Sequence, residues 1–276
     1  MKKKSSLLLW LLAFILTILL AVYQRLSGPT YPIRGSETVA GKTIKYKFYR
    51  SWTAGQELPV RVSVGKDGFE LRLHHRRFPF ISTEDWTSLV MEKKDGVFSA
   101  AVPGQPAAGK VAYKVEVLTG GESVWLNHGR PAVARFKGEV PAWLLIIHVI
   151  FMFAGLLLAF RAGLEALRRD GRWQTLVPWT LAVTTFGGLF LGPLVQKYAF
   201  GTFWAGFPLG GDLTDSKTLF AVLFWLAAFF LRKKSRWWTV AATVLMVAVY
   251  LIPHSVLGSE LNYKTGKIET AKEVPH

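Results

Sequence analysis

Residues 7–22 read LLLWLLAFILTILLAV, an apolar run without a charged side chain. A second run, WLLIIHVIFMFAGLLLAF at residues 143–160, is interrupted only by one histidine. A helix rises about 1.5 Å per residue, so runs of this length approach the span of a hydrocarbon core of about 30 Å. Both segments therefore predict membrane helices, which divide the chain into an apolar start, a polar middle and an apolar second half.

The second half contains three more apolar runs, at residues 173–195, 218–231 and 237–252, giving five predicted spans. The run at 218–231 is short for a membrane, because it would extend only about 21 Å as a helix. We expect that helix to begin earlier, at Asp212 or Thr214. Asp212 and Asp215 suit a helix start, since carboxylates accept hydrogen bonds from the free amides there and oppose the helix dipole.

The formal net charge is +16, and basic residues gather beside the apolar runs. They form three clusters: Lys2, Lys3 and Lys4; Arg161, Arg168, Arg169 and Arg172; and Arg232, Lys233, Lys234 and Arg236. Positive charge at alternate ends of successive spans marks the cytoplasmic side of a membrane. We therefore interpret the excess of basic residues as a signal of membrane topology and expect no nucleic-acid partner. The first run lacks a following cleavage site, which favours an uncleaved signal anchor. The N-terminus is then expected inside and the C-terminus outside.

Residues 30–138 have a different character, with short stretches that alternate between apolar and polar side chains. The apolar positions are Ile44, Tyr46 and Phe48; Val60, Val62 and Val64; Phe69, Leu71 and Leu73; and Val111, Tyr113, Val115 and Val117. Alternation with β-branched and aromatic residues is typical of half-buried strands. About seven short strands at this spacing predict a β-sandwich.

The strand rhythm, and the segment PAAGKVAYKVEVLTGGESVW at residues 106–125, resemble immunoglobulin-like and fibronectin-type-III-like modules. The resemblance implies an all-β sandwich and no particular ligand. The predicted fold is thus an all-α membrane protein of five spans that carries an immunoglobulin-like domain. Its predicted parts are a cytoplasmic N-terminus with the signal anchor (1–28), the external β-sandwich (29–138), a four-span domain (139–253) and an external tail (254–276).

Two of the six histidines lie in or beside predicted spans, where burying a titratable side chain in lipid costs free energy. His148 is inside the second predicted span, and His254 follows Pro253 at the outer end of the fifth. An imidazole at such a depth faces a helix interface or a cavity. The two side chains are candidate ligands of a haem or metal, or proton carriers near a quinone. The alternative is that His148 hydrogen-bonds a neighbouring helix and His254 is solvated at the interface.

The predicted outer loop reads QKYAFGTFWAGFPLGGDLTDSK at residues 196–217. An interfacial aromatic belt followed by a capped helix accounts for these residue types. Within residues 200–262, FGTFW and the following Asp212 also resemble the tryptophan-rich haem-handling loop of cytochrome c biogenesis membrane proteins. The resemblance implies Trp204 as a haem-contacting aromatic and His148 and His254 as haem ligands. Phe200 replaces the first tryptophan of that pattern.

The sequence contains no cysteine, which excludes disulfides, thiol catalysis and zinc–thiolate sites, and it contains no enzyme motif. We therefore favour a non-enzymatic scaffold or accessory subunit whose external domain binds a membrane or periplasmic protein. The alternative is a haem- or quinone-handling protein with a site at the outer face. The lysine-led anchor fits a multi-pass protein of a bacterial inner membrane, with the lipid bilayer as its first partner.

Overall fold

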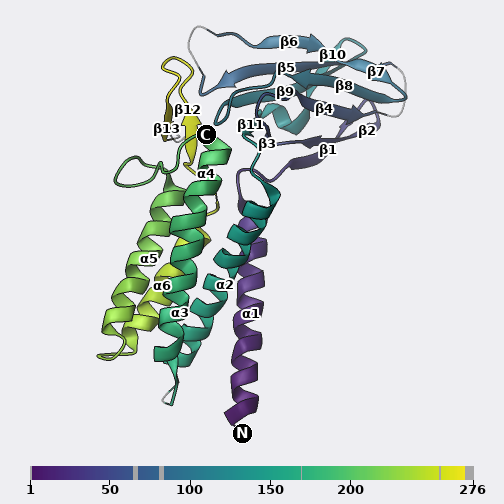
Figure 1. Cartoon of the computed structure of the whole chain (residues 1–276). Coiled ribbons are helices and arrows are strands. Elements are labelled where there is room, and N and C mark those ends of the chain that lie inside the picture. Colours follow the sequence, from purple (N-terminus) through teal and green to yellow (C-terminus); the bar gives the residue numbers. More distant parts are fainter. Residues whose placement is uncertain (1, 65–67, 81–83, 169, 255, 271–276) are drawn as a thin grey trace. The chain divides into compact units, whose positions relative to one another are not determined.

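The computed structural model describes residues 2–64, 68–80, 84–168, 170–254 and 256–270, with side chains from Ser6 onward. Helices and β-sheets are segregated into two compact units (Figure 1). The helical unit comprises Met1–Pro29, Val140–Ser259 and Glu269–His276. The β unit comprises Thr30–Glu139 and Glu260–Ile268. The β unit is therefore assembled from two separate stretches of the chain.

Among its described residues, the helical unit contains six α-helices and a π-helical turn. They are α1 (Lys2–Ser27), α2 (Ala142–Ala166), α3 (Trp173–Thr185), the π-helical turn Phe186–Leu191, α4 (Gly192–Phe200), α5 (Leu213–Leu231) and α6 (Trp237–Leu251). In the part of the chain that the structure describes, four helical segments are long and apolar enough, by length and composition, to cross a membrane: Ser6–Ser27, Ala142–Ala166, Trp173–Phe200 and Leu213–Leu231. Helix α6 is apolar but has only 15 residues. Four of the five predicted spans therefore reach spanning length.

Two helix boundaries differ from the ends of the apolar runs. Helix α5 begins at Leu213 with Asp212 as its N-cap, which confirms the expected earlier start. Helix α2 continues beyond the apolar run, which ends at Phe160, and includes Arg161 and the residues up to Ala166. The Arg161 side chain is only 5% exposed and forms an ion pair with Glu165, one helical turn later. Pairing within the helix allows this charge to be buried.

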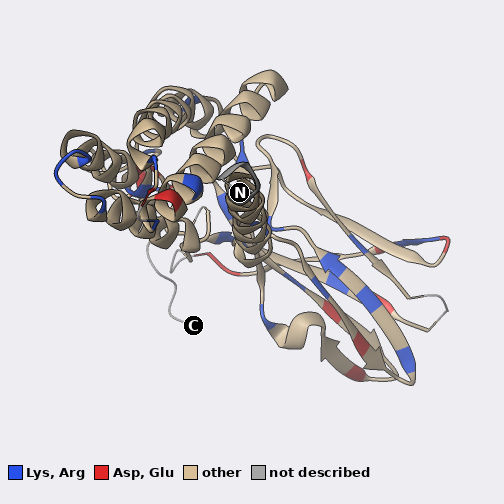
Figure 2. Ribbon diagram, turned by 90° about the horizontal axis from the view of Figure 1, so that it is seen from below, with Lys and Arg blue, Asp and Glu red and all other residues tan. Residues whose placement is uncertain are grey.

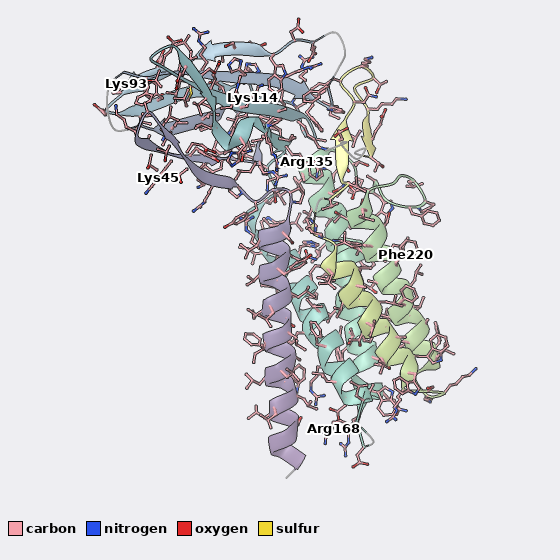
Figure 3. All side chains as sticks on the ribbon, turned by 180° about the vertical axis from the view of Figure 1, so that it is seen from behind. Lys45, Lys93, Lys114, Arg135, Arg168 and Phe220 are labelled. Atoms are coloured by element: carbon pink, nitrogen blue, oxygen red, sulfur yellow. The ribbon has the colours of Figure 1, made fainter. Side chains whose placement is uncertain are left out.

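Side chains from five helices form the core of the helical unit. The fully buried members are Leu156, Ala159, Ala162, Val177, Trp225, Ala228 and Met246, joined by Leu20, Ala221 and Ala242. The Trp225 indole N–H points at the Met246 sulfur, 3.1 Å away. Many large apolar side chains instead face outward, among them Phe220, which is 43% exposed (Figure 3). A soluble unit rarely exposes this much apolar surface, whereas lipid covers it at no cost.

Glycines allow the helices to approach each other closely, and a threonine stands opposite three of them. A Cβ on Gly155 would lie 2.7 Å from the Thr184 hydroxyl, and one on Gly188 2.5 Å from the Thr218 methyl group. A Cβ on Gly163 would lie 2.7 Å from both side-chain tips of Thr243. Small residues at helix contacts are typical of membrane bundles, where backbone proximity replaces hydrophobic burial as the source of packing.

The β unit contains two sheets. One has the order β1 (Ile33–Val39), β2 (Lys42–Phe48), β4 (Leu58–Ser63), β8 (Val97–Val102) and β7 (Glu92–Lys94). The other has the order β3 (Ser51–Thr53), β11 (Ala132–Lys137), β9 (Lys110–Thr119), β5 (Glu70–Phe78) and β6 (Thr87–Val90), and β10 (Glu122–Trp125) also pairs with β9. All pairings are antiparallel except that of β11 with β3.

Both sheets contribute to one apolar core, which contains the alternating residues of the predicted strands. Ile44, Val60 and Leu73 are at most 2% exposed, as is Val115. The side chains between these positions are polar, and Lys and Arg recur along the strands (blue in Figure 2). The predicted strands are confirmed as β2, β4, β5 and β9. Their period of two directs one face of each sheet inward and leaves the other solvated.

The tail of the chain forms a hairpin of β12 (Ser259–Leu261) and β13 (Ile268–Thr270). Within the β unit, the Leu261 amide donates to the Ala108 carbonyl over 3.0 Å. Glu260 and Lys110 form an ion pair of 2.5 Å with little solvent exposure. The hairpin segment 260–268 is thus attached to the start of β9 by both backbone and side chain.

Candidate functional site

The predicted outer loop folds back on the first turn of α5. The Asp215 carboxylate accepts the Ala205 amide at 2.8 Å, and the Ser216 hydroxyl accepts the Phe207 amide at 2.9 Å. The Trp204 indole N–H donates to the Phe207 carbonyl at 3.1 Å. These hydrogen bonds satisfy polar groups of the loop, partly within the loop and partly with side chains of α5. The aromatic segment is therefore held in a defined position against the start of α5.

Asp212 is 2% exposed and binds two segments at once. One carboxylate oxygen accepts the Thr214 amide at 2.8 Å, which caps α5. The other accepts both the amide and the hydroxyl of Ser259, at 2.6 and 2.7 Å. A buried carboxylate is stable when amides and hydroxyls saturate it in this way. Asp212 therefore anchors the tail to α5 within the helical unit.

Lys217 is a buried cation that the sequence analysis did not single out. Its side chain is 8% exposed, and its ammonium donates to the Ile252 carbonyl at 2.8 Å. The bond occupies the C-terminal end of α6, where the last carbonyls of a helix have no partner within it. A lysine at the start of a predicted span was a signal for this role, because a charge there needs a partner inside the protein.

His148 lies on α2 against the π-helical turn. Its Nδ1 is 2.9 Å from the Gly187 carbonyl oxygen, so this nitrogen carries the proton and donates. In the neutral ring, Nε2 then has the lone pair that a metal requires. Turns of the π type widen a helix and occur frequently at functional sites. The His148–Gly187 contact is the hydrogen bond to a neighbouring helix that was one of the two interpretations of the sequence. It places the proton on Nδ1, which is the tautomer that can bind a metal through Nε2.

The structure brings only part of the predicted site together. Asp212, Asp215 and the loop of Trp204 share one hydrogen-bond network, whereas His148 bonds to a different segment at Gly187. His254 follows α6, and its carbonyl is near Gly28 at the end of α1. Within the described ranges, no group of three or more His, Asp or Glu side chains could hold a metal ion.

The β unit contains a cleft of about 480 Å³ at the C-terminal end of β5. Segments far apart in sequence build it: the end of β5, the approach to β6, the loop after β8 and the start of β9. The lining residues are His75, Arg76, Arg77, Glu84, Asp85, Trp86, Thr87, Pro103, Gln105 and Val111. Most of these side chains are planar and polar, so the cleft offers hydrogen-bonding groups beside apolar surface.

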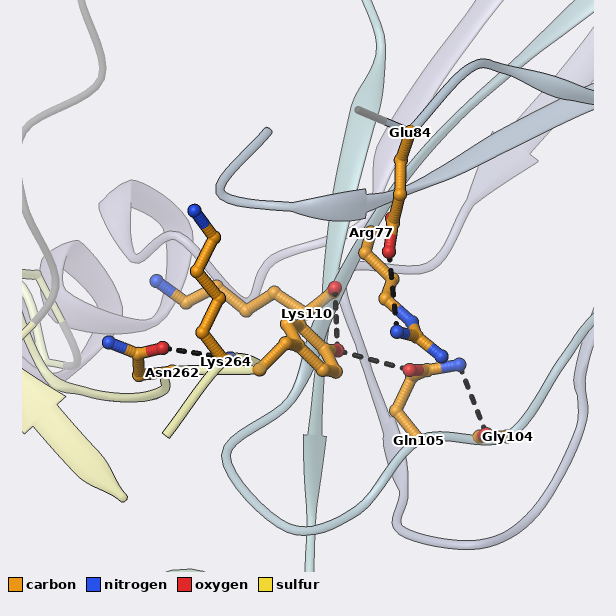
Figure 4. Close-up of polar contacts among 8 residues, drawn as sticks. Arg77, Glu84, Gly104, Gln105, Lys110, Asn262 and Lys264 are labelled. Carbon is orange, nitrogen blue, oxygen red and sulfur yellow. Dashed lines mark hydrogen bonds and ion pairs between the residues drawn. The ribbon is translucent and has the colours of Figure 1, made fainter. Parts of the chain in front are cut away.

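A polar network fixes one wall of this cleft (Figure 4). The Tyr263 hydroxyl lies 3.1 Å from Gln105 Oε1 and 3.0 Å from the Lys110 carbonyl oxygen. Arg77 is 5.1 Å from the Tyr263 ring centre and donates to Glu84 at 3.3 Å. Burial raises the pKa of Tyr263 to about 12, so its hydroxyl remains a donor at neutral pH. Tyr263 and Arg77 therefore have defined positions beside the cleft.

The buried pair of Lys110 and Glu260 lies beside this wall. Burial lowers the pKa of Lys110 below its usual value, although the hydrogen bond and charge of Glu260 act in the opposite direction. The pair holds the tail segment that carries Tyr263. No local sequence pattern signalled this wall, because Gln105, Lys110 and Tyr263 meet only after the tail has returned to β9.

The adjacent residues His74 and His75 lie on opposite faces of β5, as expected for a strand. His74 Nε2 is 3.0 Å from a Glu116 oxygen, and its ring packs against Trp125. His75 lines the cleft, and burial lowers its pKa below the ordinary value. A hydrogen bond from Ser123, supported by His74, lowers the pKa of Glu116 despite partial burial. The two imidazoles therefore have separate environments.

No family model matches the chain. One solved structure that it resembles is titled "Crystal structure of Br derivative BhCBM56", at 11% sequence identity. The match covers 36% of this chain and 97% of that chain, with a TM-score of 0.26. A likeness at this level carries no argument about fold or ligand.

Proposed function

We propose that this chain is a non-enzymatic membrane scaffold whose β unit, an immunoglobulin-like sandwich outside a bacterial inner membrane, binds a strand of a protein partner. The observation that carries the proposal is the outer edge of β6. All four residues of β6 are exposed, and Val90 is 65% exposed. In the sheet order of the described residues, β6 pairs with β5 on one side only.

An edge of this kind presents unpaired amides and carbonyls to which another chain can add a strand. Leu89 and Val90 are adjacent in β6, so they offer apolar side chains to both faces of an added strand. Natural edge strands usually carry charges that prevent such pairing, and β6 carries none. The edge therefore supports binding of a partner by strand addition.

A photoreactive amino acid at Val90, used in native membranes, tests this proposal. The expected result is one reproducible protein adduct, which disappears when Leu89→Lys places a charge on the edge. The matched control is a probe at Thr43, an exposed residue of β2, which has neighbours on both sides. An adduct of equal yield from position 43, or no adduct from position 90, would show that the β6 edge is not the binding surface.

A second candidate, a haem- or quinone-handling protein, is favoured by the tautomer of His148. Its Nδ1–H donates to a backbone carbonyl of the π-helical turn, the support that metal-bound histidines commonly receive, and this leaves the lone pair on Nε2. Haem would supply one-electron redox chemistry, and His254 would be the second residue that holds it. His148 would bind the iron, and the Gly187 carbonyl would orient the ring.

A visible spectrum of the reduced protein, purified in mild detergent after haem supplementation, separates the two candidates. The haem candidate expects a Soret band that is lost in His148→Ala and in His254→Ala. Gln196→Ala is a suitable control, because Gln196 bonds to Ser259 and to no candidate ligand. The absence of a band from the supplemented protein would contradict haem binding and leave the scaffold proposal unaffected.

A further inference from the structure

We propose that the cleft of the β unit binds a neutral saccharide, with Arg77, Trp86 and Thr87 in contact with the sugar. This inference goes beyond the scaffold function and does not depend on it. The cleft meets β6 only at its first residue, Thr87, whereas the proposed strand addition uses Leu89 and Val90. The cleft volume of about 480 Å³ lies within the usual range of ligand pockets.

The chemistry of the lining selects for hydroxyl groups. Guanidinium, carboxylate and imidazole groups supply both donors and acceptors in planar arrangements, from Arg77, Glu84, Asp85 and His75. Pairs of neighbouring sugar hydroxyls both donate and accept, so such groups can satisfy them. A polyol can therefore form hydrogen bonds with these groups, which an apolar ligand cannot.

Trp86 supplies a large aromatic surface in the cleft. Sugar rings have apolar C–H faces, which pack on an aromatic plane. Lys114 lies 4.9 Å from the Trp86 ring centre, and Phe80 lies 6.0 Å from it, so neighbouring side chains support the indole. The cleft thus combines one packing surface with several hydrogen-bonding groups, which is the combination that an amphiphilic ring requires.

The charge of the lining favours a neutral sugar over an acidic one. Arg77 is already paired with Glu84, and the lining also contains one more basic and one more acidic residue, Arg76 and Asp85. The lowered pKa of His75 keeps its imidazole largely neutral at pH 7. An anionic ligand would have to compete with Glu84 for Arg77 and would face Asp85. The balance of charges therefore opposes it.

One wall of the cleft is ordered before any ligand arrives. Gln105 Nε2 donates to the Pro103 and Gly104 carbonyls at 2.9 and 3.1 Å, while its oxygen faces the Tyr263 hydroxyl. Arg77 lies between Glu84 and the Tyr263 ring, which restricts its rotamers. Groups that are already fixed lose little conformational entropy on binding, so a weakly binding ligand such as a sugar gains affinity.

The test uses the full chain in a detergent without a sugar head group, since glycoside detergents would compete. The probes for calorimetric titration are maltohexaose, cellohexaose, chitohexaose, mannohexaose and the acidic comparison hexagalacturonate. At least one neutral probe is expected to bind saturably. Trp86→Ala and Arg77→Gln should each weaken that binding at least tenfold. Arg61→Gln, an exposed arginine on β4 of the other sheet, should leave it unchanged.

Thr87→Arg provides a variant that does not remove packing. Thr87 is exposed on an edge strand and lines the cleft, so the larger side chain should fill the cleft without unfolding the unit. Retained binding in this variant would overturn the proposal. Binding of hexagalacturonate alone, or of none of the probes, would also overturn it. Loss of the adduct from position 90 would contradict only the scaffold proposal, so the two failures can be told apart.

Discussion

Asp212 illustrates at the residue scale how a predicted site residue acquires a structural role. The sequence indicated a helix cap or a site, and the cap is what the carboxylate forms with Thr214. Its second oxygen binds Ser259, a residue far away in the chain whose involvement no local pattern could predict. With the amides of Thr214, Asp215 and Ser259 and one hydroxyl bound to it, this carboxylate has little remaining capacity for a ligand.

Asp212→Asn should destabilise the helical unit by about 1–3 kcal/mol, because the new NH₂ group would face the Ser259 amide and leave a buried donor unsatisfied. The measurement is the melting temperature of the protein in detergent, with tryptophan fluorescence as the signal of unfolding. Asp215→Asn is the matched control: its amide oxygen can still accept the Ala205 amide, so a smaller loss is expected. Equal losses in the two variants would contradict the anchoring role of Asp212.

His75 should make the stability of the β unit depend on pH. Its pKa is lowered in the folded state, so the unfolded chain binds more protons between that pKa and about 6.5. Stability is therefore expected to fall as the pH decreases below about 6.5. His75→Gln should reduce this loss, measured as the change in melting temperature between pH 7.5 and pH 5. An identical acid response in the variant and the parent would exclude His75 as the source.

At the scale of elements, the strands were predictable and their assembly was not. The alternation of apolar and polar residues located β2, β4, β5 and β9. This pattern is visible in the local sequence because each strand has one buried and one exposed face. The start of α5 was also predictable from its capping acid. The π-helical turn and the tail hairpin were not anticipated, because contacts with other segments stabilise them. The cleft was hidden for the same reason, since its walls come from separated segments.

The glycine contacts lead to a prediction about α2 and α6. Gly163→Ala places a methyl group 2.7 Å from the Thr243 side chain, whose hydroxyl donates to the Ala159 carbonyl between these helices. The helices must separate, so a loss of about 1–3 kcal/mol is expected. Gly192→Ala should be neutral or stabilising, since its Cβ would meet only ordinary contacts at 3.7 and 3.8 Å. Thermal unfolding of both variants in detergent measures the difference.

A tolerated Gly163→Ala would show that α2 and α6 do not pack as closely as described. The double variant Gly163→Ala with Thr243→Ala should recover part of the lost stability, because the second change removes the obstructing groups. Recovery that depends on this pair identifies the contact itself as the cause of the loss.

At the scale of the whole molecule, the distribution of charge and apolar length supports an alternating path through a membrane. Four helical segments have sufficient length, and the shorter α6 extends about 22 Å at 1.5 Å per residue. A thinned bilayer or neighbouring protein can accommodate a helix of that length. We expect all five segments to cross, with the basic clusters inside.

Reporters that are active only outside the membrane test this path. A fusion after residue 276 should be active, and one in the loop between α2 and α3, at residue 170, should be inactive. Residue 138, at the end of the β unit, provides a third position and should be active. The same side for residues 170 and 276 would contradict five crossings and indicate that α6 does not span.

The hairpin segment 260–268 has a consequence for biosynthesis. It completes the β unit with Glu260 and Tyr263, yet a ribosome makes it only after all the described helices of the helical unit have been synthesised. The strands between residues 30 and 139 are therefore synthesised earlier and lack segment 260–268 until synthesis of the hydrophobic half of the protein is complete. Premature termination after α6 would leave every strand of the two sheets present but the Lys110 ammonium without its carboxylate partner. The β unit can thus be completed by segment 260–268 only after the helices from α1 to α6 have been synthesised.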